Sequence, residues 1–136
     1  MWSSRFDAAA ITERLARAAG HQTAVREDLV LRDAAPARPA SVLLPLIGPG
    51  RDWAGDEDGS WRLLFIRRAE HDQDRHSGEV AFPGGRADPG DCDPVATALR
   101  EAQEEIGLDP SHIQVLGQMR PLRSVSGYRV TPVVGL

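Results

Sequence analysis

The sequence is poor in cysteine, in aromatic residues and in positive charge, and it has no long apolar run. One cysteine in 136 residues excludes a disulfide within the chain, and nothing favours secretion. Aspartate and glutamate outnumber lysine and arginine by 20 to 16, so the net charge of −4 lacks the basic footprint of a nucleic-acid-binding protein. No apolar stretch could span a bilayer and no signal-peptide pattern is present, so we expect a cytoplasmic protein with no membrane or nucleic-acid partner.

The sequence contains the material for one folded domain, with 41% hydrophobic residues. Apolar periodicity predicts a helix at 3–19, an aperiodic connection at 21–39, and strands at 41–47, 61–67, 78–82, 113–119 and 126–134. This order, with a second helix after the third strand, favours an α+β or α/β/α sandwich with a mixed sheet. Pro45 predicts that the first strand lies at an edge or carries a bulge. Alternation in the second strand places Leu64 and Ile66 on one face, and Phe65 and Arg67 on the other.

The second helix has the clearest boundaries. Asp93 is a good N-cap, and Pro94 suits the first helical position, where a missing N–H costs nothing. Gly107 can end the helix in the left-handed conformation. Between these limits an apolar stripe recurs at helical spacing, formed by Val95, Ala98, Leu99, Ala102 and Ile106.

The opposite side of this helix is acidic, with Glu101, Glu104 and Glu105 beside Arg100. Like charges one turn apart destabilise a helix by about 0.2–0.5 kcal/mol per pair, so something must offset them. Solvent and Arg100 are one answer, and a bound Mg²⁺ or Mn²⁺ is the other, because these ions prefer oxygen ligands. The preceding FPGG turn, residues 82–85, favours the ion, because adjacent glycines let the backbone approach a ligand closely.

Residues 84–108 resemble the Nudix box. The segment REAQEEIGL, residues 100–108, matches the second half of that motif at every fixed position. The first half departs from it, because Gly85 is followed after five residues by Asp91 instead of glutamate. Asp91 also lies one residue further from Arg100 than the general pattern has it, and the regular interval leads to Cys92.

This longer spacing, together with GEVAFPGG at 78–85 and LFIRRA at 64–69, is similar to the coenzyme A diphosphatase branch of the Nudix family. The middle of that upstream motif is one residue longer here than in the branch. Arg75 therefore comes one place late, and Asp74 stands where the motif has an arginine. The resemblance implies a Nudix fold with a mixed sheet between helices. It places the Nudix domain at 41–136 and a helix with its connection at 1–40. Family members continue beyond the point that corresponds to Leu136, so we expect the C-terminal part to be absent.

The same resemblance implies a metal-dependent hydrolase that cuts a diphosphate linkage of coenzyme A or a derivative into phosphopantetheine and adenosine bisphosphate. The implied ligands of Mg²⁺ or Mn²⁺ are Glu101, Glu104, Glu105 and the Gly85 carbonyl. Glu104 is our candidate general base. Arg100 is expected to pair with a nearby carboxylate and fix the loop against the helix.

Substrate contacts are expected from three arginines, Arg67, Arg68 and Arg75, because guanidinium groups pair bidentately with phosphate. The resemblance adds Phe82, Gly84 and Gly85, and Tyr128 is a candidate to lie over a base or a pantetheine arm. Two alternatives stay open: hydrolysis of another nucleoside diphosphate derivative such as ADP-ribose, and a catalytically silent Nudix-fold module that binds a nucleotide or a protein. A homodimer is one expected assembly.

Overall fold

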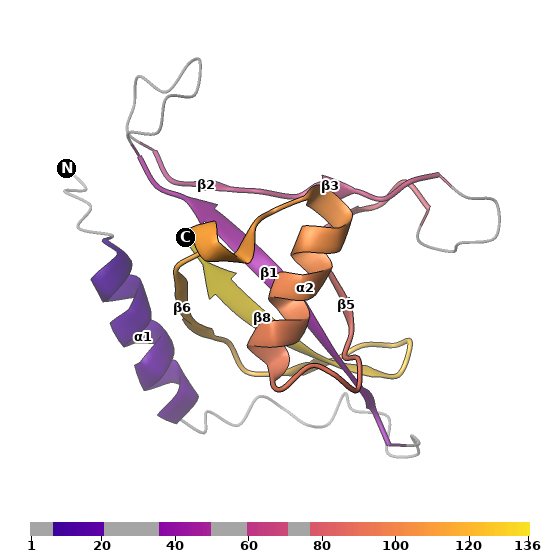
Figure 1. Cartoon of the computed structure of the whole chain (residues 1–136). Helices are drawn as coiled ribbons and strands as arrows, with labels where there is room; N and C mark the ends of the chain where they lie inside the picture. Colours follow the sequence, from indigo (N-terminus) through magenta and orange to yellow (C-terminus); the bar gives the residue numbers. More distant parts are fainter. Residues whose placement is uncertain (1–6, 21–35, 50–59, 71–76) are drawn as a thin grey trace.

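The computed structural model describes residues 7–20, 36–49, 60–70 and 77–136 (Figure 1). Its elements are, in chain order, α1 (Ala8–Gly20), β1 (Arg38–Ile47), β2 (Arg62–Leu63), β3 (Ile66–Arg67), β4 (Val80–Ala81), β5 (Gly84–Arg86), α2 (Pro94–Ile106), η2 (Pro110–His112), β6 (Val115–Gln118), β7 (Leu122–Arg123) and β8 (Tyr128–Gly135). The predicted α+β class with a mixed sheet is confirmed.

The main sheet is built around β1 and β8, which run parallel with Leu43 opposite Val133. The strands β2 and β5 pair antiparallel with β1, and β6 and β7 pair antiparallel with β8. A separate two-stranded sheet joins β3 to β4. The two long strands therefore form the centre, and the shorter strands extend it on both sides.

The edge position predicted from Pro45 is wrong, because β1 has partners along both of its sides. Pro45 lies where the antiparallel partner of β1 changes from β5, which ends its pairing at Val42, to β2, which begins at Leu46. A proline without an N–H is tolerated at such a change of partner. Its carbonyl still accepts a hydrogen bond from the Leu64 N–H at 3.0 Å.

The helix α2 begins and ends as predicted. The Asp93 carboxylate accepts a hydrogen bond from the Ala96 N–H at 2.8 Å, and Gly107 closes the helix with φ of 66°. Ala98 and Ala102 are buried with Leu43 and Val133, and these four residues form a buried apolar cluster. Their small side chains let the helix lie close to the sheet (Figure 1).

The apolar stripe of α2 is buried over only part of its length. Val95 and Leu99 pack partly buried against the core, but Ile106 is exposed in the last turn. The predicted stripe therefore extends beyond the part of the helix that the sheet covers. The helical period identifies the face of a helix, but it does not say how far the sheet beneath extends.

The first helix packs at the side of the sheet. Its Leu15 side chain lies 3.2 Å from the position that a Cβ on Gly117 of β6 would occupy, and Asp7 accepts a hydrogen bond from the Ala10 N–H at 2.7 Å. The first residues of the predicted helix, 3–6, and most of the predicted connection lie outside the described residues. In the part of the chain that is described, no helix is both long enough and apolar enough to cross a membrane.

Two predicted features of the strands differ in the structure. The segment predicted as one strand at 61–67 is divided into β2 and β3, although Leu64 and Ile66 are half-buried and Phe65 and Arg67 exposed, as alternation predicts. The Gly-Gly turn, expected to be a loop, is the strand β5. A Cβ on Gly84 would lie 2.4 Å from the Ser41 carbonyl oxygen, so only glycine allows this pairing with β1.

Candidate functional site

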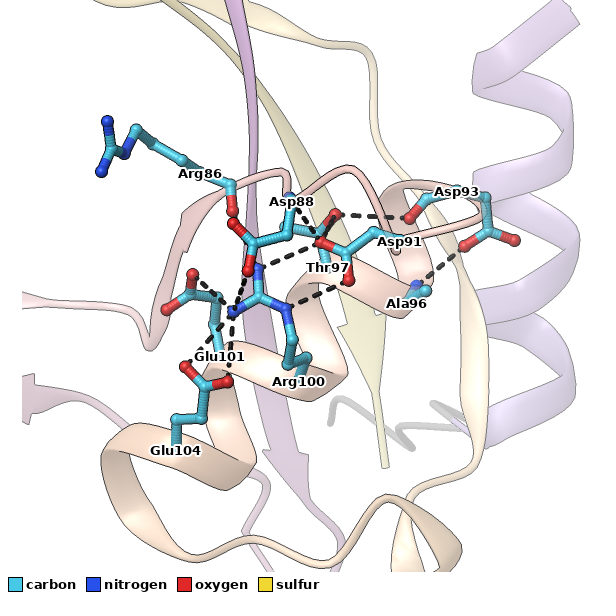
Figure 2. A network of polar contacts seen from close by, with 9 residues as sticks. All are labelled: Arg86, Asp88, Asp91, Asp93, Ala96, Thr97, Arg100, Glu101 and Glu104. Atoms are coloured by element: carbon cyan, nitrogen blue, oxygen red, sulfur yellow. Dashed lines mark hydrogen bonds and ion pairs between the residues drawn. The ribbon is translucent and has the colours of Figure 1, made fainter.

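Arg100 joins α2 to the loop that precedes it (Figure 2). Its Nε and Nη2 atoms donate hydrogen bonds to the two carboxylate oxygens of Asp91 at 3.1 and 3.0 Å. Nη2 also donates to the Arg86 carbonyl at 2.9 Å, at the end of β5. A forked guanidinium–carboxylate pair of this kind fixes both orientation and distance. Arg100 therefore makes the contact with a nearby carboxylate that the sequence suggested for it.

Asp91 is the carboxylate that this arrangement depends on, and the sequence alone did not identify its role. Its side chain is only 7% exposed, and it also accepts hydrogen bonds from the Thr97 hydroxyl and the Asp88 N–H, each at 2.9 Å. Hydrogen bonds from Arg100 first, and from the Asp88 backbone second, hold the pKa of the Asp91 carboxyl well below its usual range. The available signal was its place in the motif, at the departure from the general spacing.

The third nitrogen of Arg100 faces the acidic side of α2. Nη1 donates to Glu101 at 3.0 Å and to Glu104 at 3.2 Å, and it lies 3.8 Å from Asp88. The Asp91 hydrogen bonds, followed by those to Glu101 and Glu104, raise the pKa of Arg100 further above its ordinary high value. Arg100 thus offsets part of the repulsion between the glutamates, which was the simpler of the two explanations that the sequence allowed.

The Gly-Gly strand lies directly against the glutamates. The Gly84 N–H donates a hydrogen bond to the Glu105 carboxylate at 2.9 Å. A Cβ on Gly85 would lie 2.5 Å from the Glu101 carboxyl carbon, so that carboxylate occupies the space that any other side chain would need. The predicted site residues therefore lie together in the structure, namely Gly84, Gly85, Arg100, Glu101 and Glu105. Glu104 joins this group through its contact with Arg100.

The three glutamates do not form a preassembled metal site. Within the described residues, no group of three histidine, cysteine, aspartate or glutamate side chains is arranged to hold a metal ion. The donor chemistry nevertheless fits a hard divalent cation, because the carboxylates and the β5 backbone supply only oxygen ligands beside a cradle that a Cβ would fill. The metal ligation that we assign to Glu101, Glu104, Glu105 and Gly85 stays a prediction.

The predicted substrate-binding residues are more dispersed. Arg67 on β3 is exposed and forms an ion pair with Glu70 at 3.0 Å, and Arg68 follows it with its N–H bonded to the Glu79 carbonyl. Tyr128 begins β8, where the Arg38 guanidinium lies over its ring at 4.3 Å. Arg75 lies outside the described residues. Their roles in substrate binding stay predictions.

Phe82 is paired with an aromatic residue that the sequence reasoning did not single out. Its ring stacks on that of Phe65, with ring centroids 4.6 Å apart and an angle of 26° between the planes. The alternation of the 61–67 segment predicted only that Phe65 would face away from Leu64, so no local signal indicated this partner.

A cavity of about 210 Å³ lies at the N-terminal end of α2, between the first turn of this helix and the start of β1 and β8. Ser41, Thr131 and Arg129 line it from the sheet, and Asp91 and Thr97 line it from the loop and the helix. Asp91 therefore borders this cavity and also holds Arg100.

A mixed sheet, a Gly-Gly strand and a helix with clustered glutamates define the Nudix class of fold and site. A family model described as the NUDIX domain matches residues 54–134. The chain therefore belongs to the Nudix family.

Curated relatives support this assignment. The protein described as "Uncharacterized Nudix hydrolase NudL" from Yersinia pestis (strain Pestoides F) is 48% identical over 99 residues, which cover 73% of this chain and 45% of that protein. Its counterpart from Yersinia pseudotuberculosis serotype O:1b matches to the same extent. The chain thus spans about half the length of the curated relatives that it matches.

Solved structures confirm the fold. The Nudix hydrolase RenU from M. smegmatis has a TM-score of 0.55 at 24% identity, over 72% of this chain and 59% of that one. The C. elegans Ap4A hydrolase, solved as a binary complex, has a TM-score of 0.53 at 19% identity, over 71% of this chain and 63% of that one. At these identities the similarity is one of fold.

Proposed function

We propose that this protein is a divalent-metal-dependent hydrolase that cleaves the diphosphate linkage of coenzyme A or a derivative, giving phosphopantetheine and adenosine bisphosphate. The contact between the Gly84–Gly85 backbone and the carboxylates of Glu105 and Glu101 carries the proposal. It places backbone groups and acidic oxygens around one spot, which suits a cation that bridges protein and phosphate. Nudix hydrolases generally use Mg²⁺ or Mn²⁺.

The charged residues of α2 and the β5 backbone are assigned parts in this reaction. When bound, the cation screens the charge of the diphosphate and lowers the pKa of bound water. Glu101 and Glu105 are the main ligands, with Glu104 and the Gly85 carbonyl completing the set. Glu104 is also the candidate general base, because its side chain is 58% exposed and can turn toward a water molecule. Arg100 positions the glutamates through its pairing with Asp91.

The coenzyme A specificity rests on the upstream motif. Its two segments, 64–69 and 78–85, are joined by the β3–β4 pairing, with Ile66 opposite Ala81 and Arg67 opposite Val80. The motif is therefore one local structure that leads directly into β5 and the glutamates. Arg67 and Arg68 at this position are suited to contact substrate phosphates, with Arg75 as a third candidate.

The experiment is a comparison of substrates with Mg²⁺ present. Coenzyme A, ADP-ribose, NADH and oxidised dGTP are incubated with the protein, and the phosphate-ester products are quantified by chromatography. We expect coenzyme A to be cleaved with the highest kcat/KM. A strong preference for any of the other three would reject the coenzyme A branch and favour the alternative hydrolase, which the extra residue at 73–75 keeps open.

The Glu105→Gln variant tests catalysis itself. We expect its rate to fall by more than about 100-fold, since even the outer partners of metal ligands are worth roughly 10–100-fold. Glu13→Gln, which makes the same charge change on an exposed turn of α1, is the matched control and should keep the wild-type rate. Equal rates near background in wild type and Glu105→Gln would favour the silent binding module.

A further inference from the structure

The stacked pair of Phe65 and Phe82 is half open to solvent. Phe65 is 50% exposed, although its other side lies on the Phe82 ring. Aromatic rings contribute most when they are buried, and an offset stack leaves the outer ring face available to a further ring. Val80, on the adjoining strand β4, is also exposed at 68%, but it pairs with Arg67 and lies outside the stack.

The stacked pair lies close along the chain to Gly84, which contacts one of the glutamates. Phe82 precedes Gly84 by two residues, so their Cα atoms are at most about 7.6 Å apart. The N–H of Gly84 is the group that bonds to Glu105. A ligand whose diphosphate lies at Glu105 and Glu101 therefore has the aromatic pair within reach of its remaining part.

We propose that Phe65, supported from behind by Phe82, is the stacking platform for the nucleobase of the substrate. This inference rests on the proposed function and specifies the ligand chemistry as a purine nucleoside diphosphate. Stacking on an aromatic side chain strengthens binding by about 5–150-fold per base, and it accepts a base without needing hydrogen bonds to its edge. Phe65 thus contacts the base, and the glutamates with their cation bind the diphosphate.

The test compares two ligands that cannot be hydrolysed and that differ only by the nucleoside, α,β-methylene-ADP and methylenediphosphonate. Both are titrated calorimetrically with Mg²⁺ into wild type, Phe65→Leu, Phe65→Tyr and Val80→Ala. NMR then follows the adenine H2 and H8 resonances, which ring currents of a stacked aromatic shift upfield. Thermal unfolding confirms that each variant is folded, and sedimentation velocity reports its oligomeric state.

We expect Phe65→Leu to weaken α,β-methylene-ADP by at least about 5-fold, to leave methylenediphosphonate unchanged, and to abolish the upfield shifts. Phe65→Tyr keeps an aromatic ring and should retain wild-type affinity, and Val80→Ala should change neither ligand. An unchanged nucleotide affinity in Phe65→Leu overturns the platform, as does an equal loss for both ligands. A change in sedimentation with no change in nucleotide affinity would instead identify the pair as an interface between copies.

The two proposals fail in different ways. If wild type binds methylenediphosphonate with Mg²⁺ but gains nothing from the nucleoside, the platform is wrong and the proposed function stands. If wild type binds neither ligand, both are wrong. Upfield adenine shifts without any Mg²⁺-dependent binding of methylenediphosphonate would retain the platform and reject the metal-dependent function.

Discussion

Arg100 connects three parts of the chain that the sequence separates: the end of β5, the loop at Asp91 and the glutamates of α2. The interval between Gly85 and Arg100 is one residue longer than in the general motif, and this difference could have broken the connection. It does not, because Asp91 is turned back by its hydrogen bond to the Asp88 N–H and still meets the guanidinium with both oxygens. The departure from the general motif thus concerns the spacing, and it does not prevent a carboxylate from meeting Arg100.

Replacing Gly85 by alanine should reduce activity sharply. The new Cβ would lie 2.5 Å from the Glu101 carboxyl carbon, so the carboxylate must move from its place beside the strand. We expect Mg²⁺-dependent hydrolysis to fall by more than about 10-fold, as expected when the support of a metal ligand is disturbed. Gly90→Ala is the control, because its Cβ would meet nothing within 4 Å. Equal activity in the two variants would contradict the placement of Glu101.

Asp91 should make stability depend on acid pH. Its pKa is lower in the folded protein than in the unfolded chain, where it is about 3.9. The unfolded state therefore binds the proton first, so the stabilisation is complete above about pH 5 and is lost as the pH falls through 4 toward the folded value.

In Asp91→Asn this stabilisation is absent at every pH. The melting temperatures of wild type and variant, measured by circular dichroism, should differ most near pH 7 and converge toward pH 3. Asp88→Asn removes only the longer contact of 3.8 Å to Arg100 and should change the profile less. A difference between wild type and Asp91→Asn that stays constant with pH would show that the carboxylate charge is not responsible.

At the scale of the element, α2 is defined by its own ends. Asp93 accepts the Ala96 N–H, and the Gly107 N–H bonds to the Ala102 and Gln103 carbonyls. These caps are local, so the sequence predicts them without knowledge of the fold. The strand β5 is the contrary case. Gly84–Arg86 has no strand propensity, and it becomes a strand because β1 lies beside it and glycine lets the two backbones approach.

Removal of the N-cap should destabilise the protein measurably. Asp93→Ala loses the 2.8 Å hydrogen bond to the Ala96 N–H. We expect a loss of about 0.5–2 kcal/mol in the free energy of unfolding, determined by urea titration. The neighbouring residue Cys92 is exposed, so Cys92→Ala should stay within about 0.5 kcal/mol of wild type. A smaller effect for Asp93 than for Cys92 would contradict the capping role.

At the scale of the whole molecule, the described part of the chain has a small buried cluster between α2 and the parallel pair β1–β8, and we expect stability to depend on it. Leu43 and Val133 meet Ala98 and Ala102 there, with no exposed surface on Leu43. The same contact holds the glutamates over β5, because α2 carries both the alanines and the acidic face. Core packing and site geometry are therefore coupled through a single helix.

Leu43→Ala should cost about 2–5 kcal/mol of unfolding free energy, because it leaves a cavity under α2. Leu122→Ala on β7, where the leucine is 63% exposed, is the matched change and should cost less than about 0.5 kcal/mol. Denaturant titration of both variants decides the point. Similar losses in the two would mean that the core does not lie where the structure places it.

The sequence by itself determined the features that depend on neighbours along the chain: both ends of α2, the apolar stripe that contains Ala98 and Ala102, and the alternation around Phe65. Tertiary structure decided the rest. It placed Pro45 inside a central strand, made a strand of residues 84–86, left Ile106 exposed, and brought Asp91 to Arg100 and Phe65 to Phe82. The physical reason is that caps and periodicity act within a few residues, whereas strand partners, the reach of a sheet beneath a helix and contacts across a loop exist only once distant segments have met.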